Sequence, residues 1–201
     1  MVILALETTT NICSVAIGTV ESYLEDSRDI PRKHNEQLLG MIDSVVKHSG
    51  YEKQQIDCVA FSAGPGSFTG VRLGASVTQA IATGLNCQSY CVPSALVLAE
   101  VARPLGRVGR ELITVRRSRR EWVYVAKLCK DQDKDDFTLI EEQLERESDV
   151  PDTSNVVHDD LFNLSATLVL EIAAKRTEEW HDPQFALPIY VTGDTPWKKT
   201  N

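Results

Sequence analysis

The fold of this chain is organised around the stretch Ala63-Gly64-Pro65-Gly66-Ser67-Phe68-Thr69-Gly70-Val71-Arg72-Leu73-Gly74. An apolar run, Ile56 to Phe61, precedes it and predicts a buried strand. A segment rich in small residues, Val71 to Leu85, predicts a helix. A strand, a glycine-rich turn and a helix start in this order often face a phosphate, because the free amides at a helix start point outward and carry positive partial charge. The first question is therefore whether this turn binds a nucleotide.

The spacing of the glycines argues against the two common nucleotide-binding loops. A Walker loop has four residues between its glycines and then Lys-Ser/Thr, whereas five residues separate Gly64 from Gly70, and Val71-Arg72 follows. The dinucleotide pattern also fails, because Thr69 stands where its third glycine belongs. The turn therefore matches neither loop.

Close packing explains the turn better than ligand binding does. Small residues recur at a spacing of four on one helical face, and these are Gly66, Gly70, Gly74, Thr78 and Ala82. Such a face lets another backbone approach closely, either within this chain or in a partner. Ser67 or Thr69 is expected to cap the helix, which requires no ligand.

The bulk properties indicate a globular protein that acts inside the cell. Among 201 residues, 42% are hydrophobic and 25% are charged, and the net charge of −8 argues against a chain that is basic as a whole. No apolar run approaches the roughly 20 residues of a membrane span, and the run Val2 to Leu6 is too short for a secretory signal. The five cysteines match neither a zinc site nor a disulfide framework, which predicts reduced thiols and a cytoplasmic location.

The order of the predicted elements indicates an α/β fold. Through residue 102 we expect strands at 2–6, 12–17 and 21–26, a helix at 34–48, a strand at 56–61, the helix after the turn, a strand at 87–92 and a short helix from 93. Strands that alternate with helices extend the opening meander with parallel strands, which is half of an actin-like fold.

A change of composition after residue 103 predicts a second lobe. We assign 1–103 to an N-terminal lobe and 104–201 to a smaller, degenerate lobe with an irregular tail. In the second lobe we expect a hairpin at 111–115 and 122–128, weak strands near 137–140 and 155–157, a helix at 161–176 and a short strand at 187–191.

No residue pattern predicts a catalytic, cofactor or metal site. The four histidines form no His-x-x-x-His or His-Glu-x-x-His pair, and His34 and Glu36 at a helix start are expected to serve in capping. The run Arg116 to Arg120 is the one cluster of basic residues. Contact with RNA phosphate is one explanation, and a solvated hairpin turn that balances the acidic segment beyond it is the favoured one.

Several motifs together resemble the bacterial TsaB (YeaZ) family. They are Gly64-Pro65-Gly66-Ser67-Phe68-Thr69-Gly70-Val71-Arg72-Leu73-Gly74, the N-terminal Ile3-Leu4-Ala5-Leu6-Glu7-Thr8-Thr9, Cys13-Ser14-Val15-Ala16, and Pro31-Arg32-Lys33-His34-Asn35-Glu36 with Leu38-Leu39 and Met41-Ile42. The resemblance is specific over about residues 1–100. It implies an actin-like (ASKHA, ribonuclease H-like) fold of two lobes, with the second lobe reduced.

The resemblance also implies a function. Family members are non-catalytic subunits that support the transferase TsaD, which with the ATPase TsaE modifies the adenosine beside the tRNA anticodon. It implies that the helices after Lys33 and Thr69 pair with TsaD or with a second copy of the chain, while tRNA is contacted indirectly or weakly. The residues expected at this surface are His34, Glu36, Leu38, Leu39, Met41, Ile42, Val45, Val71, Gly74, Thr78, Ile81 and Ala82.

Two departures from the family pattern bear on phosphate chemistry. Glu7 stands where the family more often has aspartate, and Arg117-Ser118-Arg119 replaces an Asp-Ala-Arg before Val123-Tyr124. Two other hypotheses about the function remain open at this point. One is an actin-like-fold enzyme, either an ATP-dependent kinase or a glycoprotease-like peptidase, and the other is a stand-alone RNA-binding module.

Overall fold

The computed structural model describes residues 1–105, 110–131 and 136–191. The chain separates into two compact units. The first comprises Met1–Val97 together with Leu164–Ile189, and the second comprises Leu98–Asn163 and the described residues from Tyr190. The boundary that the sequence predicts between two lobes, at residues 103 and 104, remains a proposal. That prediction assigned residues 164–189 to the second lobe, whereas they belong to the first compact unit.

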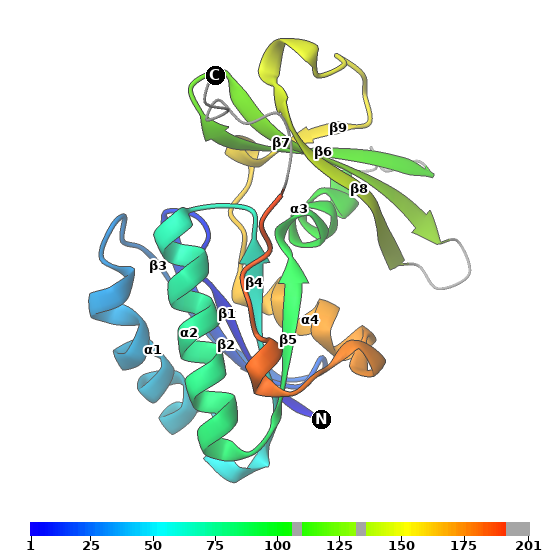
Figure 1. Cartoon of the computed structure of the whole chain (residues 1–201). Coiled ribbons are helices and arrows are strands. Elements are labelled where there is room, and N and C mark those ends of the chain that lie inside the picture. Colours follow the sequence, from blue (N-terminus) through cyan, green and yellow to red (C-terminus); the bar gives the residue numbers. More distant parts are fainter. Residues whose placement is uncertain (106–109, 132–135, 192–201) are drawn as a thin grey trace. The chain divides into compact units, whose positions relative to one another are not determined.

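The first unit is built on a five-stranded sheet. Its strands are β1 (Val2–Glu7), β2 (Ile12–Gly18), β3 (Tyr23–Asp29), β4 (Ile56–Gly64) and β5 (Gln88–Pro93), in the order β3-β2-β1-β4-β5. The pairs β1–β2 and β2–β3 are antiparallel, whereas β1–β4 and β4–β5 are parallel. An antiparallel meander extended by parallel strands is the actin-like arrangement, and the predicted fold class is confirmed (Figure 1).

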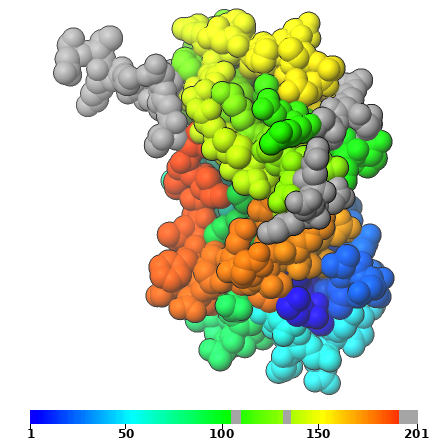
Figure 2. All heavy atoms as spheres, turned by 90° about the vertical axis from the view of Figure 1, so that its right-hand side faces the viewer, coloured from blue at the N-terminus to red at the C-terminus, as the bar shows by residue number. Residues whose placement is uncertain are grey.

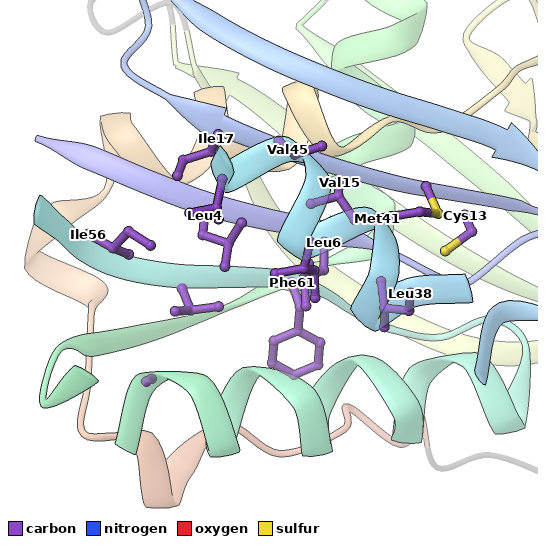
Figure 3. Close-up of a cluster of buried hydrophobic side chains, with 14 of the residues drawn as sticks. Leu4, Leu6, Cys13, Val15, Ile17, Leu38, Met41, Val45, Ile56 and Phe61 are labelled. Atoms are coloured by element: carbon purple, nitrogen blue, oxygen red, sulfur yellow. The ribbon is translucent and has the colours of Figure 1, made fainter. Parts of the chain in front are cut away.

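Helices α1 (His34–His48) and α2 (Phe68–Leu85) cover one face of this sheet. Alternation along the strands turns Leu4 and Leu6 of β1 and Phe61 of β4 toward these helices, where they are fully buried. Figure 3 shows the Phe61 ring directed at α2 and the Met41 side chain of α1 beside Cys13 of β2. The predicted bounds of α1 are confirmed, because its apolar residues recur at three and four.

Helix α4 (Ala166–Lys175) lies against the other face of the sheet, chiefly on β1, β2 and β4. Figure 2 shows this segment, in orange, beside the N-terminal strands in blue. Two side chains from the meander bind its first backbone amides: Ser14 Oγ accepts from Ala166 N at 3.0 Å, and Glu25 Oε1 accepts from Thr167 N at 3.2 Å. Ser14 Oγ also donates to Glu25 Oε1 at 2.6 Å. The helix begins five residues later than predicted, because 159–161 forms a separate 3-10 turn, η4 (Asp159–Leu161).

The segment 177–189, which we call the strap, is fixed along β5 and α2. It contains the 3-10 turns η5 (Thr177–Glu179) and η6 (Pro183–Phe185). Ser89 and His181 exchange two backbone hydrogen bonds of 2.9 Å, Tyr90 donates to Glu179 at 2.7 Å, and Ile189 N donates to Ala63 O at 2.8 Å. The strand predicted at 187–191 was wrong, since this stretch is held by isolated contacts rather than by a ladder.

The second unit is a four-stranded sheet in the order β8-β7-β6-β9. Its strands are β6 (Glu111–Arg119), β7 (Trp122–Asp131), β8 (Asp136–Arg146) and β9 (Val156–His158), preceded by α3 (Ser94–Ala102) and the 3-10 turn η2 (Arg103–Leu105). The predicted hairpin is confirmed and continues into a long β8. Val115, Val123 and Val125 form a buried cluster on one face of this sheet.

None of the helices in the described ranges combines the length and the apolar content that crossing a bilayer requires.

Candidate functional site

The glycine-rich turn joins the end of β4 to the start of α2 and is tied to the turn after β1. Ser67 Oγ accepts a hydrogen bond from Gly70 N at 3.3 Å, and Ser67 O accepts from Val71 N at 2.9 Å. Ser67 N in turn donates to Thr9 O at 2.9 Å. Ser67 is therefore the helix cap that the sequence allowed, while Thr69 lies within the first turn of α2.

The small-residue face of α2 packs inside the first unit. A Cβ atom at Gly70 would lie 1.9 Å from Thr8 O, and one at Gly74 would lie 2.8 Å from Thr8 Oγ1 and 3.3 Å from the Phe61 ring. Thr8 Oγ1 donates to Gly70 O at 2.8 Å, which closes this contact. The expected contact of this face with a partner helix is therefore corrected: the face packs against Thr8, in the turn after β1, and against Phe61 of β4. Gly66 precedes the helix.

The carboxyl group of Glu7 is engaged by its own turn. Glu7 is fully buried, and its Oε1 accepts from both Thr9 N and Thr9 Oγ1 at 2.6 Å. Its Oε2 atom is buried without a hydrogen-bond partner. Within the described ranges, no group of three or more His, Cys, Asp or Glu side chains is arranged to hold a metal ion.

The residues predicted at the partner surface divide into two sets. Most are buried in the first unit and support the helices from within: His34, Leu38, Met41, Ile42, Val45, Val71, Gly74, Thr78 and Ala82. Glu36 and Leu39 of α1 are exposed, and Ile81 of α2 is half-buried. His34 does not cap α1, because its Nε2 lies 3.2 Å from Ile12 O and no side chain caps the helix start.

An apolar groove of about 380 Å³ lies between α1 and α2. Its lining residues are Leu4, Leu39, Ile42, Asp43, Val46, Lys53, Ile56, Ile81, Gly84 and Leu85. Leu39 is the most exposed of its large apolar residues, with 63% of its surface accessible. Asp43 and Lys53 add one charge of each sign to the lining. Sequence reasoning missed the other groove residues, because only the fold brings the end of α2 beside the middle of α1; they are Leu4, Asp43, Val46, Lys53, Ile56, Gly84 and Leu85.

At the start of α2 the remaining motif residues form an exposed pair. The Arg72 guanidinium lies 3.7 Å from the centre of the Phe68 ring, one helical turn away. Phe68 is 62% exposed. A cation over an aromatic face is attracted by the ring quadrupole, so the two side chains order one another.

The arginine run does not form a single basic patch. Arg116 is buried, with its Nε 3.3 Å from Asp159 Oδ2, whereas Arg117 on the opposite face of β6 approaches Glu147 at 4.0 Å. Arg120 occupies the hairpin turn with a φ of 50°. The favoured explanation, a hairpin turn whose charges are balanced by acidic residues, agrees with these pairs.

All five cysteines are free. Cys13 and Cys58 are buried, and the other three are partly buried. Burial raises the pKa of the Cys13 thiol to about 12 and that of the Cys91 thiol to about 11. The predicted burial is complete for two of the five, and the reduced state of the thiols stays a prediction.

Comparison with known proteins connects this architecture to one family. The family model described as "TsaD: tRNA N6-adenosine threonylcarbamoyltransferase" matches residues 28–156. The chain is 31% identical over 137 residues to the tRNA threonylcarbamoyladenosine biosynthesis protein TsaB of Haemophilus influenzae, covering 68% of this chain and 58% of that protein. It is 37% identical over 105 residues to the TsaB protein of Escherichia coli K12, covering 51% and 44%. The matched segments thus span about half the length of these relatives.

A solved structure extends the similarity over almost the whole chain. YeaZ from Pseudomonas aeruginosa superposes with a TM-score of 0.82 at 25% identity, covering 94% of this chain and 99% of that one. A second structure, described as similar to peptidase YeaZ from the same organism, gives a TM-score of 0.84.

Proposed function

Because this chain belongs to the TsaB (YeaZ) family, we propose that it is a non-catalytic accessory subunit of tRNA threonylcarbamoyladenosine biosynthesis. It binds a TsaD-type catalytic subunit through the sides of α1 and α2 that line the groove between them. The TsaD-type subunit carries out the transfer to the adenosine beside the anticodon of tRNA.

The observation that carries this proposal is the apolar groove between α1 and α2. The two helices are the ones that the family resemblance assigns to pairing. Burying a leucine side chain such as Leu39 in a complex removes apolar surface from water and stabilises the complex by about 1.5–3 kcal/mol. Asp43 and Lys53 allow a partner with the matching charges to bind in one orientation.

The state of the glycine-rich turn supports an accessory role. Its serine caps α2, and its glycines let α2 approach the backbone of Thr8, so the turn is occupied by contacts within the chain. Glu7, whose position in the first hairpin would face a phosphate, directs one carboxylate oxygen to Thr9. The glycine-rich turn and the Glu7 carboxylate thus both make contacts that stabilise the fold.

Further partners follow from the same proposal. We expect a TsaE-type ATPase in the complete assembly, self-pairing of the purified chain as a dimer through the same helices, and contact with tRNA chiefly through the catalytic subunit. We place the complex in the cytoplasm, where tRNA is modified.

The test is the affinity of the full chain for a purified TsaD-type subunit, measured by calorimetric titration. We expect Leu39→Asp to weaken binding by at least about tenfold, because a charge would enter an apolar contact. Leu39 is exposed, so its replacement leaves the thermal stability of the isolated chain unchanged within error. Ile140→Asp is the matched control, since Ile140 is 65% exposed on β8 of the second unit. Binding of the wild-type chain that is absent, or unchanged in Leu39→Asp, would contradict the proposal.

A further inference from the structure

Gly84 is a helical glycine that the fold of this chain does not require. It is the second-last residue of α2, and a Cβ atom built on it would meet nothing within 4 Å. Glycine weakens a helix relative to alanine, because it loses more backbone freedom on folding. Gly70 and Gly74 of the same helix differ, since their Cβ atoms would collide with Thr8.

The residues around Gly84 show where its lack of a side chain leaves space. Gly84 lines the groove together with Ile81 and Leu85 of the same helix. Across the groove lie apolar residues of α1, with Leu39 exposed and Val46 buried. The absence of a side chain at residue 84 therefore widens the groove at its α2 wall, among apolar groups and beside the charges of Asp43 and Lys53.

We propose that Gly84 is a specificity-determining residue of this groove: it admits a large apolar side chain from a helix of the TsaD-type subunit. The inserted side chain is flanked by a basic group that faces Asp43 and an acidic group that faces Lys53. The inference rests on the proposed function. The TsaD-named family model matches a segment of this chain that includes α1 and α2, so a TsaD-type subunit carries comparable helices that can enter the groove.

The experiment combines thermal unfolding of the full chain with titration against the purified TsaD-type subunit. We expect Gly84→Ala to raise the unfolding midpoint, because alanine favours the helix, and to weaken binding by about tenfold, because its methyl group narrows the groove where the inserted side chain would lie. Gly84→Leu weakens binding by about a hundredfold or more. The matched control is Gly40→Ala: Gly40 is also helical with open space around it. It does not line the groove, so this variant gains stability and keeps its affinity.

The outcomes separate this inference from the function on which it rests. Wild-type affinity in both Gly84 variants overturns the inference, while the Leu39→Asp measurement still decides the docking proposal. A loss of self-association in Gly84→Leu with unchanged affinity for the TsaD-type subunit also overturns it, because the groove then accepts a second copy of this chain.

Discussion

At the scale of single residues, Gly70 decides how α2 lies on the sheet. Its Cα approaches the backbone carbonyl of Thr8 so closely that a Cβ atom would lie 1.9 Å from the oxygen. Backbone atoms of a buried turn cannot move aside as the end of a flexible side chain can. Any residue with a side chain at position 70 must therefore push α2 away from the turn that follows β1.

We expect Gly70→Ala to lower the free energy of unfolding by about 3 kcal/mol, the upper part of the range for overpacked cores. Urea denaturation followed by circular dichroism measures it. Gly40→Ala serves as the control, since it adds the same methyl group to an exposed position of α1. It should raise the free energy of unfolding by up to about 1 kcal/mol. Equal effects of the two substitutions would show that the contact with Thr8 does not constrain α2.

Glu142 makes the stability of the second unit depend on pH. Burial raises the pKa of this carboxyl group on β8 from its ordinary 4.5 to about 7, and the charge of Arg116 acts in the opposite direction. Because the folded chain holds this proton more tightly than the unfolded chain, the contribution to stability is fully present below about pH 4.5. It is lost as the pH rises to about 7.

The Glu142→Gln variant should remove this dependence, because glutamine is neutral at every pH in the window. At pH 7.5 we expect the variant to be more stable than the wild type by up to about 3 kcal/mol, at about 1.4 kcal/mol per pKa unit. At pH 4.5 the two should be equal. Urea unfolding midpoints at five pH values between 4.5 and 8 measure this, and parallel curves for the two proteins would contradict it.

At the scale of elements, the start of α4 is capped by side chains from far away in the sequence. Ser14 on β2 and Glu25 on β3 accept from its first two amides, and Ser14 donates to Glu25. A carboxylate at a helix start also meets the positive end of the helix dipole. The meander thus fixes both the position and the direction of α4.

We expect Ser14→Ala to destabilise the chain by about 1–2 kcal/mol, because it leaves a buried amide of α4 without an acceptor and removes a donor to Glu25. Ser27→Ala is the control, since Ser27 is the exposed cross-strand neighbour of Ser14. Amide hydrogen exchange at Ala166 and Thr167 should accelerate only in Ser14→Ala. Unchanged exchange there would show that the cap does not hold the helix.

At the scale of the whole molecule, the first unit is assembled from two distant parts of the chain. Residues 164–189 supply the helix on one sheet face and the strap along β5 and α2. Val169, Leu170 and Ile172 of α4 are buried in this unit. Without them the apolar residues of that sheet face would be open to water.

A chain in which residues 1–97 are joined by a flexible linker to 164–189 should unfold cooperatively in urea, because it contains every element of the first unit. Residues 1–97 alone should lack a cooperative transition and bind a dye specific for exposed apolar surface. A cooperative transition in the 1–97 fragment would show that α4 and the strap are dispensable for this unit.

The sequence by itself determined the features that depend on local pattern. The bounds of α1, the succession of strands and helices through residue 102, and the family all follow from periodicity, turn residues and a long motif, and they are confirmed. The sequence also allowed two caps for α2, Ser67 and Thr69, and the structure uses Ser67. These signals are local because each depends on residues close together in the chain.

Only the tertiary structure decided how these elements face one another. It turned the small-residue face of α2 inward, paired Arg116 with Asp159, returned residues 164–189 to the first unit and brought Gly84 beside α1 in the groove. The physical reason is that helix rotation and long-range pairing depend on the fit of side chains from distant segments. The small-residue face of α2 carries no local signal that tells whether it packs within the chain or against a partner.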